Sequence, residues 1–296
     1  MKNKYCFVAV LLFVTAVCAG IFTGLYNTTQ KDRTEDKVLA VTSFYPVYIV
    51  TANIVGDCEG IEVRNLSEPQ TGCLHDFQLT PEDMKLLSSA DVFLANGGGM
   101  ESFLGDVAEQ YPDLQVIETT DELRLPDENA HVWMSIRRCR SQAAYITKQL
   151  CEISPENAQE LESNAKEYDR KLAELEAQQK EIMEKAKGTK ILSFHEAYEY
   201  IADDYGLVTG YTINLDEERQ ISAGEVADVL EAVKKDDIHI LFAEELYGSG
   251  LADTVQKETD VKVYYLDTLV RGDYSLDSYI DGMQKNIDIL KDAFGV

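Results

Sequence analysis

The sequence predicts an α/β protein of two similar lobes, each with a mostly parallel four-stranded sheet, joined by one long helix. Three observations predict this fold. Short apolar, β-rich runs alternate with helical stretches, as parallel strands and their connecting helices do. One uninterrupted helical stretch separates two such series. The chain also has 296 residues, a length that suits two domains better than one.

The expected strands form two groups. Several are continuous apolar runs, which is typical of a sheet covered by helices on both faces. In the first lobe the expected strands are residues 38–42, 61–66, 91–96 and 114–119. In the second lobe they are residues 190–194, 207–213, 238–245 and 261–267.

One expected helix, residues 154–188, lies between the two groups. Ser154 is a good N-cap, Pro155 suits the first helical turn, and Gly188 ends the stretch. A helix of about 33 residues is ~50 Å long, so it is expected to run across both lobes rather than to form a coiled coil. Its apolar residues recur at spacings of four and three in a narrow stripe. They are Leu161, Ala165, Tyr168, Leu172, Leu175, Ile182 and Ala186.

The two lobes share a sequence of local signals. A helix start at Thr80–Asp83 in the first lobe corresponds to the capping box Ser222–Glu225 in the second. Each is followed by a helix, a strand, a glycine-containing loop and a further helix. The glycine run 97–99 matches no dinucleotide or P-loop pattern, so we expect turn geometry there rather than phosphate binding.

The first residues predict an exported chain. Lys2 and Lys4 precede an apolar run from about residue 5 to 25. The run can be a cleaved signal, an uncleaved anchor of membrane-spanning length, or a lipoprotein signal ending at Cys18. Each alternative exports the remainder behind a polar tether. The expected organisation is targeting segment and tether 1–36, first lobe 37–153, linking helix 154–188 and second lobe 189–296.

The net charge and the cysteine positions limit which partners, disulfide bonds and metal sites the chain can have. The net charge of −26 lacks the basic footprint that nucleic acid binding needs. Cys139 and Cys151 fall on one expected helix ~18 Å apart, beyond disulfide reach. Cys58 and Cys73 flank an expected strand; they either pair, which would pin the loop carrying His75, or remain thiols. No CxxC spacing supports a structural zinc site built from cysteines.

Three of the four histidines follow expected strands. His75 follows the run 61–66, His131 follows 114–119, and His195 comes directly off 190–194. Ligands of open α/β sheets bind at the carboxyl ends of strands, so a site in the cleft between the lobes is expected. Three imidazoles and one further group suit tetrahedral zinc better than manganese, which prefers more oxygen donors. His239 lies inside a strand run, so we expect it to be a structural residue and not a metal ligand.

The fourth ligand is expected from the second lobe. Asp267, at the end of the last strand run, is the first choice; Glu244, Glu245 and water are the alternatives. Asp76 and Glu196, beside two of the histidines, either orient imidazoles or lie in solvent. No HExxH motif is present, so a helix-borne protease site is excluded.

The sequence resembles the solute-binding proteins of bacterial zinc/manganese ABC importers over about residues 38–295. In that family one rigid helix joins two lobes. The resemblance implies that His75, His131, His195 and Asp267 are the metal ligands, with His195 marking a zinc-type member. The chain lacks the family's His-rich loop, and Thr268 replaces a proline. The resemblance depends on residues 42–57, 74–104, 130–135, 193–207 and 265–290 and on the long helix.

This resemblance implies an exported, membrane-tethered or periplasmic zinc receptor. It would act as a monomer, capture Zn²⁺ and deliver it to an ABC permease, without enzymatic activity or nucleic acid binding. Within the family the alternative is a receptor for Mn²⁺ or iron. Outside it, a secreted zinc hydrolase would use three histidines and a water, and an adhesin role is a third class.

Overall fold

The computed structural model describes residues 15, 17, 37–68, 70–215 and 221–296. The expected targeting segment and tether, including Cys18, therefore lie outside the described residues apart from Thr15 and Val17. No helix among the described residues is long and apolar enough to cross a membrane.

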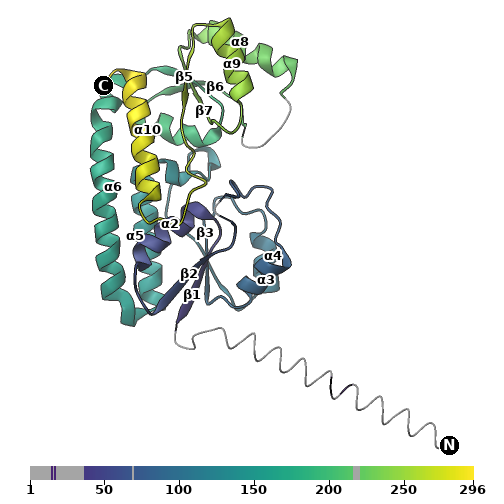
Figure 1. The fold of residues 1–296 in the computed structure, drawn as a ribbon, viewed down its shortest axis with the longest axis vertical. Helices are drawn as coiled ribbons and strands as arrows, with labels where there is room; N and C mark the ends of the chain where they lie inside the picture. Colours follow the sequence, from purple (N-terminus) through teal and green to yellow (C-terminus); the bar gives the residue numbers. More distant parts are fainter. Residues whose placement is uncertain (1–14, 16, 18–36, 69, 216–220) are drawn as a thin grey trace, which may run out of the picture. The chain divides into compact units, whose positions relative to one another are not determined.

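The first sheet has the strand order β2-β1-β3-β4, and all its strands are parallel. Its apolar runs are buried, most completely in the two central strands, where helices cover both faces. In Figure 1 the helices α3 and α4 lie on one side of this sheet and α2 and α5 on the other. The strands are β1 (Val38–Thr42), β2 (Ile61–Asn65), β3 (Val92–Ala95) and β4 (Gln115–Glu118).

The second sheet repeats that order as β6-β5-β7-β8, again with all strands parallel. All eight expected strands are present, within about two residues of their expected ends. The two-lobed α/β fold with parallel four-stranded sheets is thus confirmed. The strands are β5 (Lys190–Ser193), β6 (Val208–Thr212), β7 (Ile240–Ala243) and β8 (Lys262–Tyr265).

The connecting helices follow the signals expected from the sequence. Thr80 and Ser222 both form complete capping boxes, with Asp83 and Glu225 as their partners. The helices other than the linking one are α2 (Tyr45–Val55), α3 (Pro81–Leu87), α4 (Leu104–Gln110), α5 (Ile136–Ile153), α7 (Glu199–Tyr205), α8 (Ala223–Asp236), α9 (Ser249–Glu258) and α10 (Ser278–Phe294).

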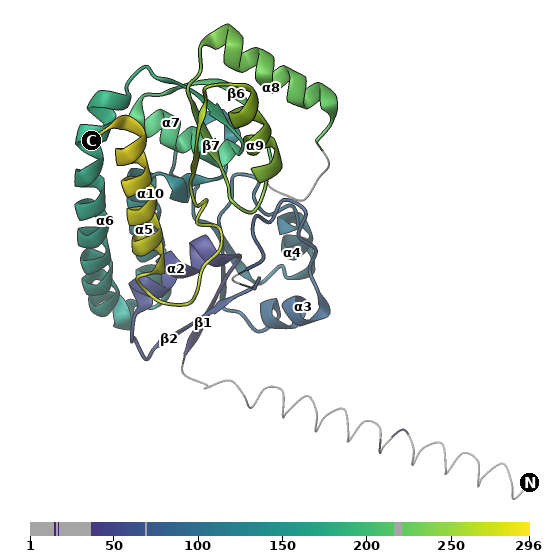
Figure 2. The ribbon, with the colours of Figure 1, turned by 45° about the horizontal axis from the view of Figure 1, so that its top comes forward.

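The long linking helix is α6 (Ala158–Ala186), with 29 residues and a length of about 43 Å. A 3₁₀ turn, Pro155–Asn157, precedes it, so Asn157 rather than Ser154 is the residue before its first turn. The helix packs against α2 and α5 of the first lobe and against α7 and α10 of the second. Figures 1 and 2 show it running beside both lobes. The expected stripe is buried except for Ala165, which is half-buried, and Gln179 joins it.

One apolar core cluster is common to both lobes, and a smaller second cluster packs β5 and β7 against α8 and α9. A continuous cluster of buried side chains extends from the first sheet through α5 and α6 to α7, α10 and the near side of the second sheet. Buried polar contacts add to it: Trp133 Nε1 donates to the carbonyl of Thr268 at 2.8 Å, and the Tyr279 hydroxyl donates to the carbonyl of Trp133 at 2.6 Å. Opening the lobes widely would expose this core to water.

Candidate metal centre

The three predicted histidines all lie beyond the carboxyl ends of parallel strands. His75 occupies a turn in the loop after β2, and His131 lies in the loop after β4, just before the 3₁₀ turn Val132–Met134. His195 follows β5 and is the N-cap residue immediately before the 3₁₀ turn Glu196–Tyr198. The duplicated strand order therefore brings loops from both lobes to one place, as expected from the sequence.

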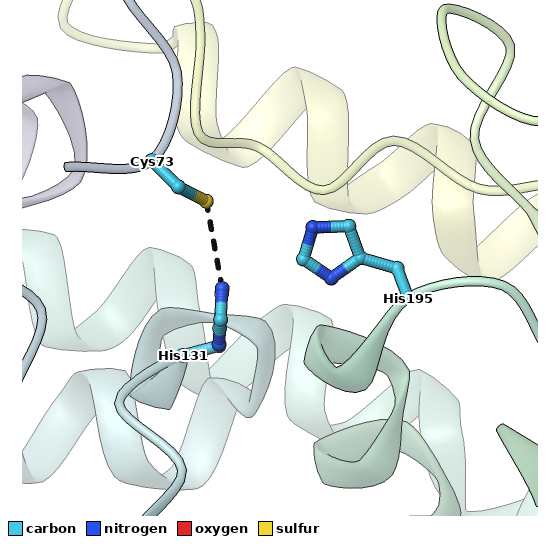
Figure 3. Close-up of side chains that lie close together, drawn as sticks. All are labelled: Cys73, His131 and His195. Carbon is cyan, nitrogen blue, oxygen red and sulfur yellow. Dashed lines mark hydrogen bonds between the residues drawn. The ribbon is translucent and has the colours of Figure 1, made fainter. Parts of the chain in front are cut away.

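The imidazoles of His131 and His195 meet at the junction of the lobes. Their ring centroids are 5.1 Å apart and nearly perpendicular, and both residues are buried. Cys73 joins them, because ligand atoms of Cys73, His131 and His195 all lie within 4.8 Å of one another. Figure 3 shows the sulfur pointing at the His131 ring and the His195 ring facing the same space.

Asn129 determines the orientation of His131. Its side-chain oxygen Oδ1 accepts hydrogen bonds from the His131 backbone at 3.0 Å and from ring nitrogen Nδ1 at 2.9 Å. Because Oδ1 can only accept, Nδ1 carries the ring proton and Nε2 presents its lone pair. Nε2 lies 3.5 Å from the Cys73 sulfur. The side chain of Asn129 also donates to the carbonyl of Glu196 in the second lobe at 2.9 Å.

His131 is held in the neutral form that a metal requires. Complete burial, reinforced by the neighbouring imidazoles of His195 and His75, holds the pKa of His131 well below its usual value of 6.5. A neutral imidazole with its Nδ1 proton committed to Asn129 is a preorganised nitrogen ligand.

His195 has a second role as a helix cap. Its Nδ1 accepts the backbone N–H of Ala197 at 3.0 Å, so Nε2 carries the proton in this conformation. A neutral imidazole that binds a metal through Nε2 carries its proton on Nδ1. Metal binding through Nε2 of His195 therefore moves the proton to Nδ1, which can then no longer accept the hydrogen bond from the Ala197 backbone. A local shift of the Glu196–Tyr198 turn, at a cost of about 1 kcal/mol for a lost cap, is therefore part of metal uptake through Nε2.

His75 lies next to His131, with ring centroids 5.7 Å apart. Its Nε2 is buried and forms no hydrogen bond within the described part of the chain. Glu196 Oε1 lies 3.8 Å from that atom and 3.7 Å from His131 Nδ1, which makes His75, His131 and Glu196 a second cluster of potential ligands. A buried nitrogen without a hydrogen bond is costly unless something else satisfies it, and a cation would do so.

Asp267, the predicted fourth ligand, belongs to neither cluster. It is exposed, and its Oδ1 accepts the backbone N–H of Leu269 at 2.8 Å. Glu244 is buried but lies 3.4 Å from the Thr268 hydroxyl and 3.8 Å from the Arg271 guanidinium. Glu245 and Asp76 are exposed, and so is His239, beside Asp237. The fourth ligand stays a prediction.

Cysteines outside the targeting segment form no disulfide bond in the described structure. Cys58 is buried in the core of the first lobe, whereas Cys73 lies at the junction with the second. Of the two alternatives left open by the sequence, the structure thus shows thiols. Cys139 and Cys151 both lie on α5, as expected.

Comparison with known proteins identifies the group to which this architecture belongs. Residues 40–293 match the family model described as zinc-uptake complex component A, periplasmic. The chain belongs to this zinc-uptake family. The family consists of substrate-binding proteins of metal transport systems.

Relatives in the zinc-uptake family carry names for different metals. The chain is 28% identical to the high-affinity zinc uptake system protein ZnuA of Bacillus subtilis, over 95% of this chain and 96% of that protein. It is also 28% identical to the manganese-binding lipoprotein MntA of Halalkalibacterium halodurans, over 97% of each. Among solved structures, the Zn(II)-bound ZnuA-like domain of Streptococcus pneumoniae AdcA has a TM-score of 0.75 and 28% identity, over 88% of this chain and 100% of that domain.

Two residues of the centre in this family member were not predicted from the sequence. The sequence predicts Cys73 only as a disulfide partner or a buried thiol, although its position two residues before His75 is compatible with a shared site. The sequence predicts no role for Asn129. Asparagine side chains in loops often accept a hydrogen bond from the backbone N–H two residues later. The position of Asn129 two residues before His131 is the sequence feature that agrees with its role.

Proposed function

We propose that this chain is the extracytoplasmic zinc receptor of an ABC importer, and that it captures Zn²⁺ where loops of the two lobes meet. One observation supports this most strongly: three imidazoles from three separate strand ends converge, and His131 among them is buried, neutral and oriented with its Nε2 toward the site. Nitrogen donors in such numbers suit zinc.

The proposed ligands are His75, His131 and His195, with Asp267 as the fourth ligand that the resemblance implies. In the structure His131 and His195 already face one another, and His75 lies beside His131 on a partly exposed turn. His75 and His195 belong to different clusters that share His131, so loading requires His75 and the His195 turn to move toward one ion. Bringing in Asp267 would require its carboxylate to leave the backbone of Leu269.

The proposed partner is an ABC permease in the membrane, to which a monomeric receptor delivers the ion. Family membership supports this partner, since the family model describes a component of a zinc-uptake complex and names it periplasmic. The export predicted from the N-terminal segment agrees with that location. We also retain the proposed organisation of tether 1–36, lobe 37–153, helix 154–188 and lobe 189–296.

A manganese or iron receptor is the alternative within the family, because relatives carry both names. The donors within the two clusters are mainly imidazole nitrogen and sulfur, with one carboxylate. Manganese prefers oxygen ligands, so this donor set favours zinc. Direct competition between Zn²⁺ and Mn²⁺ for the same protein decides between them.

The test is calorimetric titration of metal-free full-length protein with Zn²⁺, in parallel with His195→Ala and with His239→Ala as the matched control. His239 is exposed and lies outside both clusters, so its loss should leave binding unchanged. One tight site per chain that is lost or severely weakened only in His195→Ala supports the proposal. Equal binding in all three proteins would show that His195 does not bind the metal and would overturn the proposed site between the lobes.

A further inference from the structure

Cys73 lies close to the ring nitrogen of His131 whose lone pair is available. Its sulfur is 3.5 Å from Nε2 of His131, the nitrogen left available by the Asn129 bond to Nδ1. Two hydrogen bonds connect the loop that carries Cys73 to the second lobe. The Arg271 guanidinium donates to the carbonyl of Gln70 at 3.0 Å, and the Gln70 side-chain amide donates to the carbonyl of Gly272 at 2.8 Å. The thiol is therefore held at the junction where the imidazoles meet (Figure 3).

We propose that Cys73 is a sulfur ligand of the captured metal, taking beside His75, His131 and His195 the fourth position that the family resemblance gives to Asp267. This inference rests on the proposed zinc-receptor function and makes it more specific. On binding, the thiol gives its proton to solvent and a sulfur–zinc bond forms, so charge and atoms balance without any further reactant.

The geometry fits a shared ion. Zinc bonds to sulfur at about 2.3 Å and to imidazole nitrogen at about 2.0–2.1 Å, so two such ligands at the tetrahedral angle are about 3.6 Å apart. The observed separation of Cys73 Sγ and His131 Nε2 is 3.5 Å. These two atoms need almost no rearrangement to hold one zinc ion, and the third donor of the cluster, on His195, lies within 4.8 Å of both.

The neighbouring groups support the same assignment. The buried Nε2 of His75 makes no hydrogen bond in the described structure, and the ring lies 5.7 Å from that of His131. Asp267, the fourth ligand implied by the family, instead accepts a bond from the Leu269 backbone. Cys73 thus already belongs to the cluster that Asp267 would have to join.

A sulfur ligand would also determine which metal is retained. Thiolates favour zinc and other soft or borderline ions, whereas Mn²⁺ favours carboxylate and water. Relatives of this chain are named for zinc, manganese and iron, so the general architecture does not fix the metal. Cys73 gives this chain a specificity-determining residue for zinc over manganese.

X-ray absorption at the zinc edge tests the ligand directly, on anaerobically prepared full-length protein loaded with one equivalent of Zn²⁺. We expect one sulfur neighbour at about 2.3 Å in the wild type, lost in Cys73→Ser. The sulfur should remain in the control variant Cys151→Ser, because Cys151 is a half-buried cysteine near the end of α5, outside both clusters.

The outcomes separate the two proposals. A tightly bound zinc with only nitrogen and oxygen neighbours overturns the role of Cys73 and leaves the receptor function intact. Failure of the wild type to hold zinc overturns both.

Competition between Zn²⁺ and Mn²⁺ provides a second measurement. Replacing a residue that only orients a ligand typically lowers metal affinity about 10–100-fold. Loss of a ligand in Cys73→Ser should therefore lower the preference for Zn²⁺ over Mn²⁺ by about tenfold or more. An unchanged preference contradicts the specificity role.

Discussion

Replacing Asn129 by alanine should weaken zinc binding without removing any ligand. The side chain is almost fully buried and makes bonds to the His131 backbone, to His131 Nδ1 and to the carbonyl of Glu196. Without Oδ1, the hydrogen bond that assigns the ring proton to Nδ1 is lost, and the Nε2 lone pair is no longer held toward Cys73. Loss of such a partner typically lowers metal affinity by about 10–100-fold, or about 1.4–2.8 kcal/mol.

The same variant should also be less stable without metal. It leaves the buried N–H groups of His131 without acceptors, at a cost of about 1–3 kcal/mol each, so we expect a loss of about 3 kcal/mol. The two effects are measured separately, by urea unfolding of the metal-free protein and by competition with a fluorescent zinc chelator.

Two control variants distinguish orientation from general destabilisation. Asn164→Ala removes a hydrogen bond from a side-chain amide near the start of α6 to the carbonyl of Val55, outside both clusters, so this variant should lose stability but bind zinc normally. Asn129→Asp keeps an acceptor for Nδ1 and should retain affinity although it loses the donor to Glu196. The reasoning is refuted if Asn129→Ala binds zinc as tightly as the wild type.

Three further results are expected. The stability of the metal-free protein should decrease as pH falls below about 6.5, because His131 binds a proton in the unfolded state but stays neutral when buried in the folded state. The decrease, measured by urea unfolding from pH 7.5 to 5, should be smaller in His131→Gln. Trp133→Phe should cost about 1–3 kcal/mol, because the buried carbonyl of Thr268 loses its donor, and a midpoint equal to the wild type would contradict that contact. Scattering profiles with and without zinc should nearly coincide, because the shared core and α6 span both lobes, whereas a large compaction on binding would refute restricted motion.

The strands and the linking helix were predictable because their signals are local. Several strands are short apolar runs between polar segments, and the stripe of α6 repeats every three or four residues. The start of α6 was less predictable, since Pro155 favours a helical first turn but does not distinguish a 3₁₀ turn from an α-helix.

The site was predictable only in part because its contacts are not local. The rule that ligands gather at the carboxyl ends of strands identified His75, His131 and His195. It does not give the distance from Cys73 to His131, which are 58 residues apart and meet only when two loops fold over one sheet edge. The role of Asn129 depends on which ring nitrogen faces it, and no sequence pattern encodes that.

The distribution of the donors along the chain has a consequence for biosynthesis. Cys73, His75 and His131 precede α6, and His195 follows it. A partly synthesised or partly translocated chain therefore holds an incomplete donor set, whatever metal it meets. The donor set is complete only when the second lobe has docked against the first. Because the ion then binds only the docked state, its binding free energy stabilises that state. Metal occupancy in this protein would thus report that a newly exported molecule has finished folding.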